Sequence, residues 1–264
     1  MVQFADVNGT RIAYRFDGPE SAPVLTMSHS LSADHTMWDP QLAALTDAYR
    51  VLRFDTRGHG ASAAPGGEYT LDQLAGDVIG LWDALGIEKS HYCGLSMGGM
   101  IGQTLGLKAP ERLRSLVLCD TASGYPPEAQ AMWAERIKAA RANGLKAGID
   151  GTIDRWFSPG FVKSAPDVIA GVRKMIAATP VDGYCGCGAA IARLNLTGRL
   201  GEIKTPTLVI CGEDDPGTPL AMSEEIRDGI PGAQLVVLPV ARHLSNMEDV
   251  AGFNAALRSF LDAN

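Results

Sequence analysis

Short apolar runs rich in β-branched residues alternate with helical stretches along most of this chain. The runs are too short for buried helices and end in turn-forming residues, which indicates strands. The stretches between them carry helix signals, such as Thr70 before a helix over residues 71–85 and Gly86 after it. This alternation predicts an α/β fold whose mostly parallel sheet is covered on both faces. Only the first two runs, which surround Asn8-Gly9, are expected to pair as a tight hairpin. Eight strands are expected, at residues 2–7, 11–16, 23–28, 50–54, 90–94, 113–119, 206–211 and 234–238.

Residues 125–197 interrupt the alternation. This segment holds no convincing strand, and its helical stretches are broken by Gly144 and by Pro159, Pro166 and Pro180. An all-helical insertion between two strands of a sheet is typical of a cap over the sheet edge. We therefore expect a core formed by residues 1–124 and 198–264, with an inserted helical cap at 125–197.

Charge and hydropathy restrict the partners of the chain. Its formal net charge of −7 disfavours nucleic acid and anionic membranes. No apolar run approaches 18 residues, and charged residues such as Asp6, Arg11 and Arg15 interrupt the first 30, so neither a spanning helix nor a signal peptide is expected. The sequence predicts a cytoplasmic protein that binds neither nucleic acid nor membrane, and leaves its oligomeric state open.

The five cysteines do not form a disulfide or metal pattern. Cys93, Cys119 and Cys211 end apolar runs, where a buried thiol packs as a small hydrophobe. Cys185 and Cys187 could start a metal clip, but no second pair or nearby histidine completes four ligands. We therefore expect free thiols, no metal and no cofactor.

A Gly-x-Ser-x-Gly pattern centred on Ser96 is the strongest sign of chemistry. The bare pattern would arise by chance about 0.2 times in a chain with this much glycine, so its context matters. It follows an apolar strand and begins a helix, where the serine of a nucleophile elbow sits on a sharp turn with its hydroxyl exposed. Gly94 and Gly98 flank the turn where side chains would collide. We expect Ser96 to be a nucleophile.

A serine nucleophile needs a base, and His243 is the candidate. It follows the last strand and precedes the final helix, the position of the base in folds of this kind. The other histidines, at positions 29, 35, 59 and 91, lie upstream of the nucleophile.

The carboxylate that orients the base should follow the preceding strand. Asp215 is the predicted acid, and Asp214 is the alternative because a shift of one residue would exchange them.

An acyl-transfer site also needs two donors for the developing oxyanion. The residue after the nucleophile supplies one, the N–H of Met97, and the loop after the strand at 23–28 should supply the other. We assign this second donor to the N–H of Leu31. His29, in the same loop, is expected to form local hydrogen bonds rather than to act as a second base.

Four motifs carry a resemblance to a known family. The stretches DTRGHGAS (55–62), GLSMGGMIGQ (94–103), GEDDPGTP (212–219) and RHLSNME (242–248) together resemble the 3-oxoadipate enol-lactonases, which are α/β-hydrolases of aromatic degradation. The resemblance extends over nearly the whole chain, including VNGTRIAYR (7–15). The chain departs from it at Ser30, where the second oxyanion motif usually has glycine.

The resemblance implies the α/β-hydrolase fold and a small monoanionic enol-lactone as substrate, opened without a cofactor or metal. The carboxylate of such a substrate would need a cationic or donor-rich partner. The cap offers candidates for this contact, namely Trp133, Arg136, Arg155, Trp156 and Arg193.

Other functions remain open at this point. The same three residues would serve a broad carboxylesterase or perhydrolase, or a carbon–carbon bond hydrolase. A ligand receptor derived from a hydrolase is an alternative from another class, although a receptor need not keep all three residues. Dehalogenase chemistry is disfavoured because its nucleophile would be an aspartate at position 96.

Overall fold

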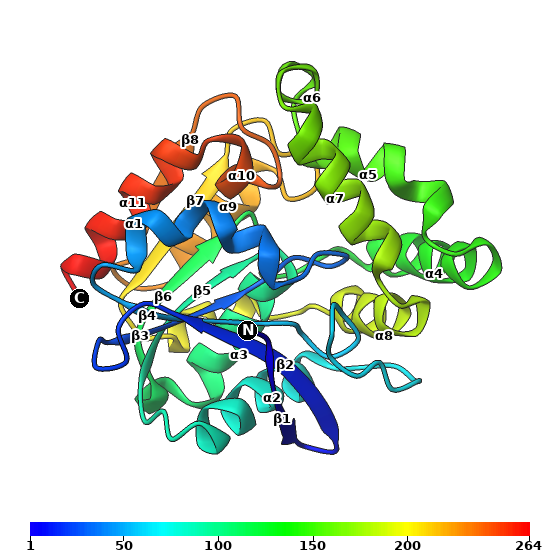
Figure 1. Cartoon of the computed structure of the whole chain (residues 1–264). Helices are drawn as coiled ribbons and strands as arrows, with labels where there is room; N and C mark the ends of the chain where they lie inside the picture. The colour runs from blue at the N-terminus through cyan, green and yellow to red at the C-terminus, as the bar shows by residue number, and fades with distance from the viewer.

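The structure is a computed structural model that describes all 264 residues. One sheet of eight strands forms the centre of the molecule (Figure 1). The strands follow the order β1-β2-β4-β3-β5-β6-β7-β8, and the pairs from β4 to β8 are parallel. Only β1 and β2 are antiparallel to their neighbours. The predicted mostly parallel, eight-stranded sheet is therefore confirmed. The strands are β1 (Gln3–Val7), β2 (Thr10–Asp17), β3 (Val24–Ser28), β4 (Arg50–Phe54), β5 (Ser90–Leu95), β6 (Leu113–Cys119), β7 (Thr207–Gly212) and β8 (Gln234–Leu238).

Helices cover both faces of the sheet because its central strands are apolar on both sides. In β6, Leu116 and Leu118 belong to one buried cluster, whereas Val117 and Cys119 belong to the other. The first cluster packs against α2 (Leu71–Ala84), α3 (Met97–Lys108) and α9 (Leu220–Gly229). The second packs against α1 (Leu42–Leu45) and α11 (Val250–Asp262). Side chains that alternate along a strand thus build two separate cores.

Local signals in the sequence define several element boundaries. Asn8 and Gly9 both have positive φ, as a two-residue hairpin turn requires, and they join β1 to β2. The hydroxyl of Thr70 accepts the N–H of Gln73 and caps α2. A 3₁₀ helix over His35–Gln41, continuous with α1, was not predicted. Pro40 lies inside that segment and removes a backbone donor, which hides the helix from pattern analysis.

Five helices occupy the chain between β6 and β7, and Figure 1 shows them together beyond one end of the sheet. They are α4 (Pro127–Asn143), α5 (Ile149–Trp156), α6 (Pro159–Ser164), α7 (Pro166–Ala178) and α8 (Val181–Ala192). Three of them begin with a proline, which is tolerated in a first turn because its missing N–H would have no partner there. The short helix α10 (Ser245–Glu248) and the 3₁₀ turns Pro110–Arg112, Lys146–Gly148 and Thr197–Glu202 complete the elements.

All five cysteines are free and buried, and the predicted burial of Cys93, Cys119 and Cys211 is confirmed. The sulfur atoms of Cys93 and Cys119, on adjacent strands, are 3.8 Å apart.

None of the helices is both long enough and apolar enough to cross a bilayer.

Candidate active site

Ser96 lies at the sharp turn between β5 and α3. Its φ of +56° and ψ of −114° lie outside the favoured regions for a residue with a side chain. Two hydrogen bonds hold this backbone: the Ser96 N–H donates to the carbonyl of Cys119 at 2.8 Å, and the Thr121 hydroxyl donates to the Ser96 carbonyl at 2.7 Å. The fold thus maintains the strained turn of a nucleophile elbow.

The glycines that flank Ser96 permit this turn. A Cβ on Gly94 would lie 2.1 Å from the carbonyl oxygen of Gly98, and a Cβ on Gly98 would lie 2.3 Å from that of Ser28. Both contacts involve backbone atoms, so a side chain at either position would move the elbow itself. The steric requirement inferred from the sequence is therefore confirmed.

Ser96, His243 and Asp215 form a continuous chain of hydrogen bonds. The Nε2 atom of His243 lies 2.9 Å from the Oγ of Ser96, and its Nδ1 lies 2.7 Å from an Oδ of Asp215. The hydroxyl of Thr218 and the N–H of Gly217 each donate to the Asp215 carboxylate at 2.7 Å. The carboxylate is therefore held from two sides, and the ring between it and the serine is oriented.

The two ionisable members stabilise each other's charged forms. Burial opposes the charge of Asp215, but the charge and hydrogen bond of His243 outweigh it and hold the pKa of Asp215 below its ordinary value. Burial likewise opposes the charge of His243, but Asp215 raises the pKa of His243 above its ordinary value. The site therefore favours a proton on the imidazole and negative charge on the carboxylate.

The two candidate acids differ in position. Asp215 is 3% exposed and contacts His243, whereas Asp214, the alternative considered, is exposed to solvent. Sequence analysis did not single out a third carboxylate, Asp120, which is fully buried after β6. Asp120 accepts the N–H of Gly212 at 2.8 Å and the hydroxyl of Ser245 at 2.6 Å, and thereby links the loops that carry Asp215 and His243.

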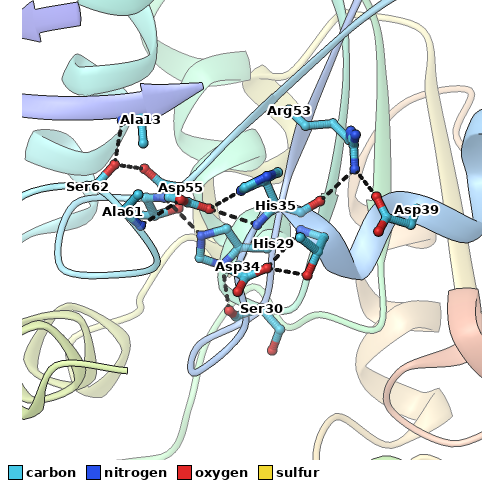
Figure 2. A network of polar contacts seen from close by, with 12 residues as sticks. Ala13, His29, Ser30, Asp34, His35, Asp39, Arg53, Asp55, Ala61 and Ser62 are labelled. Carbon is cyan, nitrogen blue, oxygen red and sulfur yellow. Dashed lines mark hydrogen bonds and ion pairs between the residues drawn. The ribbon is translucent and has the colours of Figure 1, made fainter. Parts of the chain in front are cut away.

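The residues suggested by the sequence as oxyanion donors, Met97 and Leu31, both lie near Ser96. Met97 is the first residue of α3, where backbone N–H groups have no partner within the helix. Leu31 lines the pocket that contains Ser96, and its N–H makes no hydrogen bond within the chain. His29, in the same loop, makes one local bond as expected, from its ring to the carbonyl of Ser30 at 2.7 Å (Figure 2). Its other ring nitrogen accepts the N–H of Thr56, in the loop after β4, at 2.9 Å.

A pocket of about 210 Å³ contains Ser96 and His243. Loops of the sheet form one wall, and helices between β6 and β7 form the other. The helical wall includes four of the five residues that the sequence suggested for this contact. Its members are Met132, Trp133, Arg136, Thr152, Arg155, Trp156, Tyr184 and Ile191.

Comparison with known proteins shows the family of the chain. A family model described as alpha/beta hydrolase fold matches residues 23–250. The chain is 38% identical to 3-oxoadipate enol-lactonase 2 of Acinetobacter baylyi, over 94% of this chain and 92% of that protein. The crystal structure of the enol-lactonase from Burkholderia xenovorans has a TM-score of 0.95 and 41% identity, covering 98% of this chain and 100% of that chain. The chain belongs to the 3-oxoadipate enol-lactonase family of α/β-hydrolases.

Membership of this family makes the protein an enzyme that hydrolyses carboxylic esters or lactones. The family fold also extends to an esterase. The structure of a thermophilic esterase from Thermogutta terrifontis, solved with malate bound, has a TM-score of 0.92 and 31% identity, covering 100% of this chain and 98% of that chain.

Two arginines in the enol-lactonase-family pocket have no acidic partner. No carboxylate of the chain forms an ion pair with Arg136 or Arg155. Burial, followed by the charge of Arg136, lowers the pKa of Arg155. The indole N–H of Trp133 is buried in the same wall without a hydrogen-bond partner, and Arg136 stacks on that ring at 5.0 Å from its centroid. The pocket is thus lined by two positively charged side chains, and its helical wall contains a buried, unpaired donor.

The third arginine suggested by the sequence is not in this pocket. Arg193 pairs with Glu68 on the outer surface and lines a separate hollow of about 670 Å³ between α4 and α8. The prediction for Arg193 was wrong because its guanidinium pairs with Glu68 at the surface, whereas Tyr184 and Ile191 of the same helix, α8, line the pocket. Tyr184 was missed, as was Thr218. The position of Thr218, three residues after the candidate acid, could have suggested its hydrogen bond.

One group of potential metal ligands lies beneath the Leu31 loop. Asp34, His35 and Asp55 each bring one ligand atom within 4.8 Å of the others. The carboxylate oxygens of Asp55 already accept N–H groups of His35 and Ala61, as Figure 2 shows, so this carboxylate organises the loops.

Proposed function

We propose that this enzyme opens 3-oxoadipate enol-lactone and releases 3-oxoadipate, with Ser96 as nucleophile, His243 as base and Asp215 as the orienting acid. The observation that carries the proposal is the chain of contacts from Ser96 to Asp215, at 2.9 and 2.7 Å, beside a pocket lined by two arginines without an acidic partner. A nucleophile, a base and an oriented carboxylate support acyl transfer. The arginines support an anionic acyl substrate.

In the first step, the Ser96 oxygen attacks the ring carbonyl while Nε2 of His243 takes the hydroxyl proton. The resulting imidazolium is stabilised by Asp215, whose carboxylate keeps its negative charge. The carbonyl oxygen becomes an oxyanion, for which the N–H groups of Leu31 and Met97 are the proposed donors.

Collapse of this intermediate breaks the ring carbon–oxygen bond, and the departing enol oxygen takes the proton from His243. The enol then tautomerises to a ketone, which makes ring opening effectively irreversible. His243 next removes a proton from water, the hydroxide attacks the acyl-enzyme, and the Ser96 oxygen regains its proton as 3-oxoadipate leaves. These steps use side chains, backbone amides and water alone.

Arg136 and Arg155 are the proposed partners of the substrate carboxylate. A guanidinium binds a carboxylate through charge-assisted hydrogen bonds, which are stronger in a partly buried site. The unpaired indole N–H of Trp133 offers another donor on the same wall, and Trp156 supplies apolar surface for the ring. The pocket volume of about 210 Å³ suits a small substrate.

The helical segment of residues 125–197 would then act as a cap, and residues 1–124 and 198–264 as the catalytic core. Every proposed carboxylate contact comes from the cap, whereas every proposed reacting side chain comes from the core. This division assigns substrate choice and chemistry to different parts of the chain.

The decisive experiment compares enzymatically generated enol-lactone with p-nitrophenyl acetate, a neutral ester. We expect kcat/KM for the lactone to exceed that for the ester by at least about 100-fold, because only the lactone offers a carboxylate to the arginines. A preference for the neutral ester would favour a second candidate, a broad carboxylesterase with the same reacting residues. The 31% identity with the Thermogutta terrifontis esterase supports that candidate.

A further inference from the structure

Two histidine rings join the loop after β3 to the loop after β4. The first loop contains His29 and Leu31, and the second contains Thr56 and His59. The ring of His29 accepts the N–H of Thr56 at 2.9 Å, and the ring of His59 accepts the N–H of Ser32 at 3.1 Å. Each loop therefore supplies a ring to the backbone of the other.

Both rings must be neutral to make these bonds. In each ring Nε2 is the acceptor, so the ring proton lies on Nδ1. The Nδ1 of His29 lies next to the carbonyl of Ser30, and the Nδ1 of His59 lies next to the carbonyl of Arg57. Both side chains are fully buried, and the ring centroids are 5.1 Å apart. Burial lowers the pKa of His29, and it lowers the pKa of His59 to about 3. The two acceptor nitrogens are therefore available across the physiological pH range.

The bond from Ser32 determines which N–H groups of the first loop remain free. Ser32 has a φ of +65°, a left-handed conformation that needs support in a residue with a side chain. His59 takes the N–H of Ser32, and the N–H of Ala33 donates to the carbonyl of Ser30 at 3.1 Å. The N–H of Leu31, the residue before Ser32, has no partner, and Leu31 lines the pocket with Ser96.

We propose that His59 is a positioning residue for the hydrolysis: by binding the N–H of Ser32, it fixes the loop so that the N–H of Leu31 faces the oxyanion. The inference rests on the proposed reaction at Ser96. His59 itself touches neither the substrate nor the reacting atoms. Without its ring nitrogen, the left-handed turn at Ser32 would lose its anchor and the Leu31 donor would no longer be held in place.

Other contacts hold the second loop in the fold without His59. Its carboxylate Asp55 accepts the N–H and the ring Nδ1–H of His35, each at 2.8 Å, and the N–H of Ala61 at 2.8 Å (Figure 2). The hydroxyl of Ser62 donates to the Asp55 carbonyl at 2.6 Å and accepts the N–H of Ala13. Loss of the His59 acceptor should therefore loosen the first loop and leave the second in place.

The test is a pair of substitutions that differ in where they place a polar atom. The amide of glutamine reaches the position of the imidazole Nε2, whereas the shorter amide of asparagine reaches only that of Nδ1. We expect His59→Asn to lower kcat by about 10- to 100-fold with little change in KM, since loss of a whole oxyanion donor costs about 100- to 1,000-fold. His59→Gln should keep kcat within about threefold of the wild type.

The assays use p-nitrophenyl acetate as well as the lactone, so that the result does not depend on the proposed substrate. His91→Asn is the matched control, because His91 is also buried and neutral but lies near the start of β5, where its ring bonds to the hydroxyl of Ser115. We expect its kcat to be unchanged. Equal activities of His59→Asn and His59→Gln would overturn the inference, whereas an active Ser96→Ala variant would refute the proposed reaction.

A measurement on the wild-type protein covers the case in which His59→Asn does not fold. Nitrogen NMR of the histidine side chains at neutral pH should show His59 with its proton on Nδ1 and an unprotonated, hydrogen-bonded Nε2. A proton on Nε2 would contradict the proposal, because that atom could not then accept the N–H of Ser32.

Discussion

The two walls of the pocket differ in how their polar groups are satisfied. On the core wall, Ser96, His243 and Asp215 each have a hydrogen-bond partner within the chain. On the helical wall, the guanidinium groups of Arg136 and Arg155 have no acidic partner, and the indole N–H of Trp133 has none at all. The three side chains of the core wall are thus paired without a ligand, and the N–H of Leu31 is left free beside them. The helical wall, in contrast, has charged side chains without an acidic partner.

This difference suggests how the two walls divide the work. A group that is already oriented contributes to the reaction of every substrate, because its geometry does not depend on what is bound. An unpaired buried donor gains most from a substrate that supplies the missing acceptor, and so it selects among substrates. Substitutions on the core wall should therefore lower kcat generally, and substitutions on the helical wall should act on anionic substrates.

The largest effect is expected at Ser96. Ser96→Ala removes the proposed nucleophile, and we expect kcat/KM for both the lactone and p-nitrophenyl acetate to fall by at least about 10⁴-fold. The side chain is small and 8% exposed, so thermal unfolding should change little and will show whether the variant is folded. Substantial activity on either substrate would place the chemistry elsewhere.

The second-largest expected effect distinguishes Asp215 from the adjacent Asp214. Asp215→Asn should lower kcat by about 10³- to 10⁴-fold because the imidazolium loses its stabilising charge, whereas the exposed Asp214→Asn should remain within about threefold of the wild type. Equal losses in the two variants would mean that the hydrogen-bond geometry misidentifies the acid.

The pH profile sharpens this comparison. The base must be neutral to act, and Asp215 raises the pKa of His243, so kcat/KM should rise with pH through a midpoint above the ordinary value for histidine, about 6.5. In Asp215→Asn that support is absent, and the midpoint of the residual activity should move to lower pH.

A smaller and more selective effect is expected on the helical wall. Arg136→Met and Arg155→Met keep much of the apolar side chain but remove the charge, and each should raise KM for the lactone by about 10- to 100-fold. The same variants should leave hydrolysis of p-nitrophenyl acetate within about threefold. Arg193→Met is the matched control, since this arginine lies outside the pocket and should affect neither substrate. Equal losses on both substrates would erase the distinction between the walls.

The core wall could be predicted from sequence because each of its parts is marked by local structure. Gly94 and Gly98 identify the elbow, and His243 follows the last strand, so their position along the chain implies their position in space. The choice between Asp214 and Asp215 depended on the direction of a side chain in a loop, which strand patterns do not define.

The helical wall was less predictable because its residues come from several helices whose packing is not encoded in periodicity. Arg193 looked equivalent to Arg136 in sequence, but only Arg136 faces the pocket. The contact between Gly58 and Gly183 is another example. A Cβ on Gly183 would lie 1.8 Å from the carbonyl oxygen of Gly58, so helix α8 rests on the loop that carries His59. No local pattern relates positions so far apart in the chain.

The smallest expected effect concerns Asp120, the carboxylate beneath the core wall. Burial, together with the charge of Asp215, raises the pKa of Asp120 to about 8. The folded protein therefore keeps a proton on Asp120 that the unfolded chain loses above about pH 4. This proton stabilises the fold at low pH, and the stabilisation is lost progressively as the pH rises toward 8.

Asp120→Asn should remove this dependence, because asparagine is neutral at every pH and can still accept the N–H of Gly212. We expect urea unfolding of the wild type to show that its free energy of unfolding falls as the pH rises from about 5 to about 6. In the variant this fall should be less steep, by up to about 1 kcal/mol per pH unit. This range avoids most of the contribution of His243, whose raised pKa adds a similar decline at higher pH.

Ser245→Ala is the control, since it removes a hydrogen bond to Asp120 but leaves a carboxyl group that titrates. Parallel slopes for the wild type and Asp120→Asn would mean that this carboxylate is charged in the folded enzyme, and the core wall would then hold an unneutralised negative charge beside Asp215.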